Sequence, residues 1–181
     1  HWQRRVPLEL HHAFFPQGEP AALPAEAAWA RHERAPFLGT TIRRLAPEDR
    51  LLYLCAHGTW HRWAKLKWVA DIAGLLARRP ALDGDALRRR AKDGGALRRV
   101  RLGMGLAREL LGAPVPAGWR RDLDSDPVLS KLIRTVRAQW LYTYRTTDAD
   151  PWTTLRFQLR ARERWRDRWA FLRRQLPLLL G

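Results

Sequence analysis

Apolar residues recur at helical spacing over almost the whole chain that follows Pro47, and this pattern restricts the fold more than any other feature of the sequence. The first helix has a typical start, because proline suits the first turn and the carboxylates of Glu48 and Asp49 favour the positive end of the helix dipole. The same spacing continues to Leu76 and predicts one unbroken helix there. Further helices are predicted over residues 83–93, 94–112, 126–146 and 151–176. These patterns predict a mainly α fold, a helical bundle around one sizeable core.

The first 45 residues follow a different pattern. Residues 6–11, VPLELH, alternate between apolar and polar and predict a strand, and Pro7 within it favours an edge position or a strand start. One helical turn is expected around PAEAAWARHE, and TTIRRL can form a second short strand. We therefore predict a small N-terminal β remnant, residues 1–45, followed by a helical domain, residues 46–181.

The cysteine content and the lengths of the apolar runs limit the cellular environments that suit the protein. Cys55 is the only cysteine, so no intrachain disulfide can form, and a reducing cytoplasmic compartment is favoured. Its neighbours in LLYLCAHG predict a buried small hydrophobe rather than a nucleophile. No run approaches the ~18 apolar residues of a membrane-spanning helix.

The formal net charge of +16 invites a nucleic-acid function, because clustered cations release counterions from phosphates. Thirty of the 34 basic residues are arginine, however, which a skewed genome composition can produce. Residues 78–108 hold ten basic and three acidic side chains, and residues 151–181 hold eight and two. These helices either present a solvated face, or bind RNA or DNA, or bind another acidic partner.

Several polar and aromatic side chains gather in LCAHGTWHRWAKLKWVADIAGLL, residues 54–76. On a single helix, at about 100° per residue, they share one flank that borders the apolar face. This flank comprises His57, His61, Lys65, Trp68 and Asp71. Half-buried polar groups need partners, and a ligand site is one way of supplying them. The glycine at position 58 can kink the helix or admit a close neighbour.

Three interpretations of this flank remain open. His57 and His61 have the i, i+4 spacing of a zinc pair, but the glutamate of H-E-x-x-H is absent and no third ligand follows. The histidines and tryptophans can instead pack between helices. In the third interpretation Lys65 and Lys67 contact phosphate oxygens, Asp71 fixes one of them, and a histidine donates to the ligand.

Three segments together resemble the C-terminal two-thirds of a bacterial family of nucleotidyltransferases in the DNA polymerase beta-like superfamily. They are VPLELHHAFF, LAPEDRLLYLCAHGTWHRWAKLKWVADIAGLL and the arginine-rich RARERWRDRWAFLRR. The specific part is His-Gly-x-x-His-x-Trp-x-x-Leu-Lys-Trp-x-x-Asp. The resemblance implies a small α+β palm in which a Gly-Ser turn, an Asp-x-Asp pair and a third acid hold two divalent metals. With Mg²⁺ and a nucleoside triphosphate, such a site attacks the α-phosphorus with an acceptor hydroxyl.

The resemblance also assigns roles to residues of this chain. Glu9 falls at the third acid, as a catalytic metal ligand, and His11 at the histidine that follows it, while His12 departs from the usual tryptophan. The helix beside the palm becomes a nucleotide-binding wall that supplies positive charge to the triphosphate. Its residues are His57, His61, Lys65, Lys67 and Asp71.

The principal metal ligands of that family are missing from the printed sequence. It contains no Gly-Ser dipeptide, and DGD at 83–85 and DSD at 124–126 suit turns or helix starts better than a strand before Glu9. The opening His-Trp-Gln-Arg-Arg resembles neither a translation start nor a signal peptide. We expect either that an upstream segment is missing and that the chain is inactive without it, or that this relative binds without catalysing.

Two other classes of function compete with the enzyme. The runner-up is a basic helical module that binds nucleic acid or another polyanion. The third is a structural segment whose histidines and tryptophans belong to the core.

Overall fold

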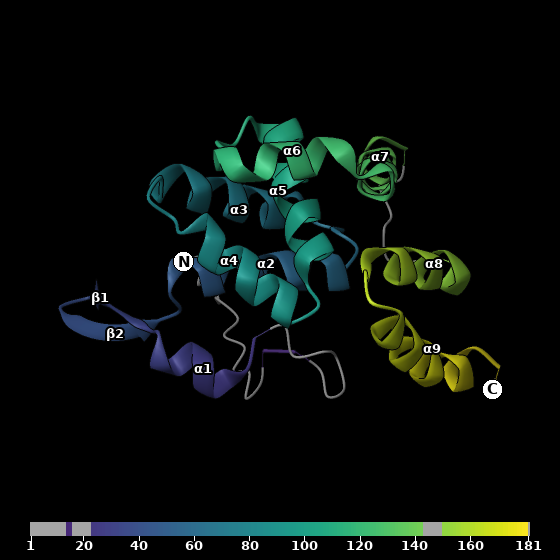
Figure 1. The fold of residues 1–181 in the computed structure, drawn as a ribbon, viewed down its shortest axis with the longest axis horizontal. Coiled ribbons are helices and arrows are strands. Elements are labelled where there is room, and N and C mark those ends of the chain that lie inside the picture. Colours follow the sequence, from purple (N-terminus) through teal and green to yellow (C-terminus); the bar gives the residue numbers. More distant parts are fainter. Residues whose placement is uncertain (1–13, 16–22, 143–149, 181) are drawn as a thin grey trace, which may run out of the picture.

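A computed structural model describes residues 14–15, 23–142 and 150–180 of the chain (Figure 1). The predicted strand at 6–11, with Glu9 and His11, lies outside these residues. The described helices are α1 (Ala25–Ala30), α2 (Pro47–Trp60), α3 (Leu66–Arg78), α4 (Gly84–Asp93), α5 (Leu97–Leu111), α6 (Ala117–Ser125), α7 (Pro127–Tyr142), α8 (Pro151–Ala161) and α9 (Trp165–Leu180). The strands are β1 (Glu33–Phe37) and β2 (Thr40–Arg44). The mainly α prediction, with a small β part, is confirmed.

Helix α5 forms the centre of the core. It packs against α2, α3, α4, α6, α7 and α8. Val100, Leu102, Met104 and Leu106 of α5 are completely buried, so this helix is covered on almost every side. Cys55 of α2 is also completely buried, as predicted, and burial raises the pKa of its thiol.

The predicted helix from Pro47 to Leu76 is in fact two helices. The chain ends α2 at Trp60, turns through residues 61–65 and begins α3 at Leu66. Arg62 and Trp63 both have left-handed backbone conformations, with φ of 53° and 58°. The amide of Trp63 donates to the carbonyl of Gly58 at 2.7 Å, which closes the end of α2 in a Schellman-type turn. The prediction failed because neither residue is the glycine or asparagine that usually marks such a turn.

The glycine at 58 does admit a close neighbour. A Cβ atom at this position would lie 2.5 Å from the ring of Trp63, which is completely buried. The ring therefore packs directly on the backbone of α2, and the turn folds back over the helix it has just left.

The predicted helix over 151–176 is also broken, between α8 and α9. Arg162 has an extended backbone there, and Glu163 turns inward to the start of α5. Its carboxylate oxygens accept hydrogen bonds from the amides of Leu97, at 3.1 Å, and Arg98, at 2.7 Å. The break thus allows Glu163 to cap the N-terminus of α5, which begins 66 residues earlier in the sequence.

The other helix predictions agree with the structure, with one omission. Helices α4 and α5 match the predicted ranges closely, and α7 covers 127–142 of the predicted 126–146. Asp83 caps α4, so DGD occupies a helix start, whereas DSD spans the last two residues of α6 and Asp126, which caps α7. Helix α6 was not predicted, because it has only nine residues and begins within the proline-containing GAPVPAG.

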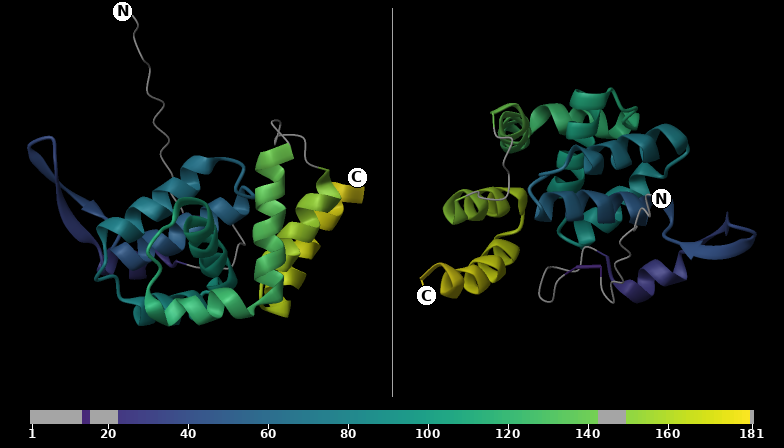
Figure 2. Two further views of the ribbon diagram at one scale, coloured as in Figure 1. Left: turned by 90° about the horizontal axis from the view of Figure 1, so that it is seen from above. Right: turned by 180° about the vertical axis from the view of Figure 1, so that it is seen from behind.

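The two strands form an antiparallel hairpin that extends away from the helices (Figure 2). TTIRRL was predicted as a strand, but its partner β1 was not, because Pro36 interrupts the pattern. A two-stranded sheet has only edge strands, where proline is tolerated. Leu38 and Gly39, with φ of 45° and 79°, make the two-residue connection.

Helices α7, α8 and α9 lie side by side at one end of the molecule (Figure 2). Within the described ranges, no helix has the length and apolar character needed to cross a membrane.

Candidate functional site

Four rings from α2 and α3 form a contiguous group, which we call the His–Trp cluster: Tyr53, His57, His61 and Trp68. The rings of His57 and His61 have centroids 4.6 Å apart, and Trp68 stacks on His61 at 5.1 Å. Trp68 also meets His57 edge to face at 5.6 Å. The sequence predicted that both histidines and Trp68 lie together, although on one helix rather than two.

The turn between α2 and α3 brings these rings together. Tyr53, His57 and His61 follow one another at i, i+4 spacing along α2 and its C-cap, so their side chains line one face. Trp68 then returns from the first turn of α3 to cover that face. Tyr53, whose ring lies 5.6 Å from that of His57, was missed at the sequence level. The signal for it was the same i, i+4 spacing.

His61 carries the clearest electrostatic perturbation of the cluster. Burial lowers the pKa of its imidazole, and the positive charge of Lys65 lowers it further. The imidazole is therefore neutral at pH 7, with one nitrogen able to donate and the other able to accept.

Lys65 lies at the edge of the cluster, and its ammonium is 5.9 Å from the ring centroid of Trp68. The side chain is exposed, and no described carboxylate forms an ion pair with it. It begins α3 in an extended conformation as the N-cap residue. A flexible cation thus stands beside a neutral histidine and a tryptophan face.

Lys67 and Asp71 are exposed on the outer surface of α3. The expected ion pair between Asp71 and a lysine does not form in the described part of the chain. The structure therefore unites His57, His61 and Lys65 around Trp68. It leaves Lys67 and Asp71 one turn apart on the neighbouring solvent-facing surface, where a ligand can reach them.

The zinc interpretation lacks a third ligand. No set of three or more histidine, cysteine, aspartate or glutamate side chains able to hold a metal occurs in the described ranges. His57 and His61 contact each other and Trp68 through their rings instead. Glu9 and His11, the other two predicted site residues, lie outside the described residues. Phe14 and Phe15, which follow them, each pack on Tyr53 with ring centroids 5.9 Å apart.

Hydrogen bonds from α7 and α8 hold the α2–α3 turn in place. Gln158 of α8 donates its amide hydrogens to the carbonyls of Thr59, at 3.0 Å, and Trp60, at 2.9 Å. The indole of Trp140 in α7 donates to the carbonyl of Trp63 at 2.8 Å. The C-terminal helices therefore fix the backbone on which His61 and Lys65 stand.

Comparison with known proteins gives one family. The model of a protein family described as "Uncharacterised nucleotidyltransferase" matches residues 1–112, which is more than half of the chain and includes the whole His–Trp cluster. No curated protein and no solved structure matches the chain.

Proposed function

The chain belongs to this family of uncharacterised nucleotidyltransferases, and from that membership we propose that it takes part in transferring a nucleoside monophosphate from a nucleoside triphosphate to an acceptor. The observation that carries the proposal is the position of the His–Trp cluster inside the matched residues, with Lys65 at its edge. A buried free thiol at Cys55 also supports a reducing, cytoplasmic setting.

In the proposed site, the exposed face around the α2–α3 turn receives the triphosphate. Lys65 and Lys67 neutralise phosphate oxygens, because a lysine ammonium is a mobile cation that no described carboxylate occupies here. His57 and His61 donate hydrogen bonds, and stacking on Trp68 restricts the orientation of His61. Asp71 lies one turn beyond Lys67 and orients it once the ligand is bound.

We also propose that Mg²⁺ accompanies the nucleotide and that Glu9 is one of its ligands. The described residues do not themselves fit a metal centre, since they contain no set of three suitable side chains. Further acids are therefore required beside Glu9, such as the Asp-x-Asp pair of the resembling superfamily, and transfer depends on them.

The alternative function is a basic module that binds nucleic acid or another polyanion. A specific observation favours it on α9, where Trp165 and Trp169 are 79% and 56% exposed, one turn apart. Arg166 and Arg173 are exposed on the same helix, and Arg166 also lies 3.6 Å from a carboxylate oxygen of Asp167. Exposed rings between cations can stack bases and contact phosphates. In block 78–108, by contrast, many arginines pair with carboxylates, as Arg98 does with Asp126 and Arg101 with Asp122.

The proposal is tested by calorimetric titration of the chain, and of any longer natural form, with ATP, GTP, CTP and UTP in magnesium. Lys65→Gln and Asp71→Asn should each weaken binding while leaving the melting temperature close to normal, because both side chains are exposed. Lys92→Gln is the matched control, since Lys92 is an exposed helical lysine on α4, away from the cluster. It should change neither quantity.

Two results would count against the site. Equal losses of affinity in Lys65→Gln and Lys92→Gln would show that the loss comes from the change in net charge and not from a specific site. Absence of nucleotide binding in every form, together with salt-sensitive binding to single-stranded RNA, would transfer the function to the arginine-rich helices.

A further inference from the structure

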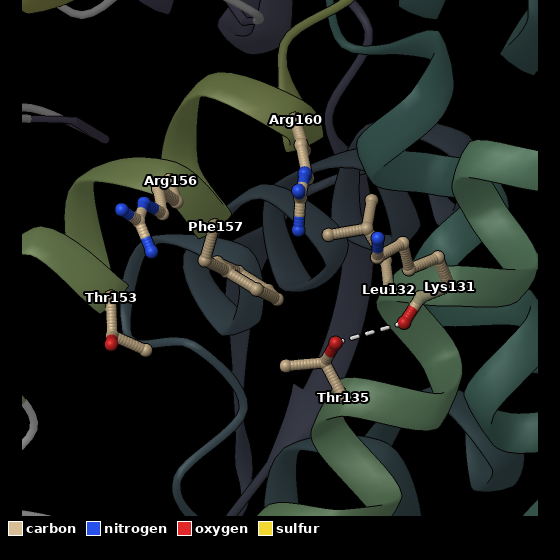
Figure 3. Close-up of a pocket in the computed structure, with 7 residues that line it drawn as sticks. All are labelled: Lys131, Leu132, Thr135, Thr153, Arg156, Phe157 and Arg160. Atoms are coloured by element: carbon tan, nitrogen blue, oxygen red, sulfur yellow. Dashed lines mark hydrogen bonds between the residues drawn. The ribbon is translucent and has the colours of Figure 1, made fainter.

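A small hollow lies between α7 and α8, beyond the residues that match the family. We call it the α7–α8 hollow, and its volume is about 190 Å³. It is lined by Lys131, Leu132 and Thr135 of α7 and by Thr153, Arg156, Phe157 and Arg160 of α8. In Figure 3, Lys131 extends from α7 toward α8, Arg160 extends from α8 toward α7, and the ring of Phe157 points between the helices.

The cations of the hollow form no ion pair with the carboxylates that the structure describes. Arg156 and Arg160 are one turn apart on α8, where like charges repel, and Lys131 faces them from α7. All three side chains are exposed, and none forms an ion pair with a described carboxylate. Elsewhere on α7, Arg137 does pair with Glu109, at 3.2 Å. Three unpaired cations around one concave space therefore attract an anion.

The carboxylate at the start of α8 is already occupied. Asp150 caps α8, and its Oδ2 accepts hydrogen bonds from the amide of Thr153, at 2.9 Å, and from its hydroxyl, at 3.1 Å. These bonds lower the pKa of Asp150, and the positive charge of Arg156 adds a smaller effect. The hydroxyl of Thr135 likewise donates to the carbonyl of Lys131, at 2.9 Å. The three cations, rather than the hydroxyls, are left to bind a ligand.

The floor and the size of the hollow define what fits. Leu132 and Phe157 are 2% and 4% exposed, so the cations act beside an apolar, weakly screening surface. Guanidinium groups pair with phosphate oxygens through two parallel hydrogen bonds. A nucleic-acid strand needs a long basic groove, whereas this half-open space of about 190 Å³ has room for one phosphate group with a small substituent.

We propose that the α7–α8 hollow binds the phosphate group of a phosphorylated small molecule. This site is separate from the nucleotide site around the α2–α3 turn, and it does not depend on the proposed transferase function. Lys131, Arg156 and Arg160 hold the phosphate, and Leu132 and Phe157 support its substituent.

The experiment titrates the full chain at low salt with inorganic phosphate, with ribose 5-phosphate and with a short single-stranded RNA. The variant Arg156→Gln/Arg160→Gln should lose roughly tenfold or more in affinity for both small ligands. Its melting temperature should stay the same or rise, because two repelling charges are removed. The matched control is Arg120→Gln/Arg121→Gln, which removes the same charge from exposed positions on α6.

Each outcome decides the proposal. Loss confined to the α8 variant, with Lys65→Gln binding phosphate normally, supports a separate phosphate site even if no nucleoside triphosphate binds. Equal losses in both double variants, or no binding of either small ligand by the unaltered chain, overturn it. Binding of RNA that is far tighter than that of ribose 5-phosphate, and lost in the α8 variant, also overturns it, in favour of a polymer surface.

Discussion

Gly58 shows at the residue scale how one missing side chain positions the candidate site. The ring of Trp63 lies 2.5 Å from the place that a Cβ atom at position 58 would take, too close for the two to coexist. Any larger residue would push the ring away, and with it the turn that orients His61 and Lys65. The geometry of the His–Trp cluster therefore depends on a residue that has no side chain to contact a ligand.

Gly58→Ala should destabilise the protein by about 1–3 kcal/mol, because a methyl group is forced into a packed ring. Denaturation in urea measures this change. Gly118→Ala is the control, because no atom lies within 4 Å of a Cβ at that exposed helical position. That substitution should stabilise α6 by roughly 0.5–1 kcal/mol. A Gly58→Ala protein as stable as the original would refute the close packing.

The sequence predicts the neighbours of a side chain well when those neighbours are close in the sequence. The i, i+4 spacing placed His57 beside His61 correctly. Asp49 shows the opposite outcome, since it was interpreted only as a favourable charge in the first turn of α2. It is 0% exposed and pairs with Arg31, at 2.8 Å, and Arg90, at 2.9 Å. These partners are 18 and 41 residues away, and no local pattern contains that information.

At the scale of helices and strands, the sequence predicted where helices exist better than where they end. The helical spacing of apolar residues continues across a turn when the helices on both sides pack against the same core, as α2 and α3 do. The breaks at 61–65 and 162–164 depend on distant groups, because Glu163 leaves the helical path to bind the amides of Leu97 and Arg98. The spacing of apolar residues indicates which side chains are buried. It does not indicate where a helix ends when distant groups cause the break.

Glu163→Ala tests the role of this residue as a cap for α5, whose own N-cap residue, Ala96, offers no side-chain acceptor. Loss of the two hydrogen bonds should cost about 1–2 kcal/mol of unfolding free energy. Thermal and urea denaturation measure the loss. Glu109→Ala, near the C-terminal end of the same helix, should have little effect because its ion pair with Arg137 is exposed. Equal effects of the two substitutions would exclude a special capping role.

At the scale of the whole molecule, the C-terminal helices brace the part of the chain that matches the family. Arg62 reinforces this bracing, since its guanidinium donates to Thr154 at 3.1 Å and to Gln139 at 3.3 Å. The left-handed backbone of Arg62 costs roughly 1 kcal/mol, which these contacts offset. Side-chain hydrogen bonds therefore join the α2–α3 turn to the α7–α8 pair.

Gln158→Leu should remove the donors for the carbonyls of Thr59 and Trp60 while keeping the side-chain volume similar, and it also removes an acceptor of Arg162. Leaving them unpaired should cost about 1–3 kcal/mol. Hydrogen exchange at the amides of Trp63 and Ala64 should then accelerate more than exchange in α4. Gln175→Leu on α9 serves as the control, since its side chain makes no described hydrogen bond. Unchanged exchange at the turn would show that α8 does not brace it.

The family match ends at residue 112, but the unit that shapes its histidine cluster does not. Three of the groups that hold the α2–α3 turn, on Gln139, Trp140 and Gln158, come later in the chain. In evolutionary terms, the two regions are not independent modules that can be exchanged freely. A relative with a different C-terminal sequence has to supply other donors for the same carbonyls. A graft of the matched region into another protein has to include the helices that carry these donors.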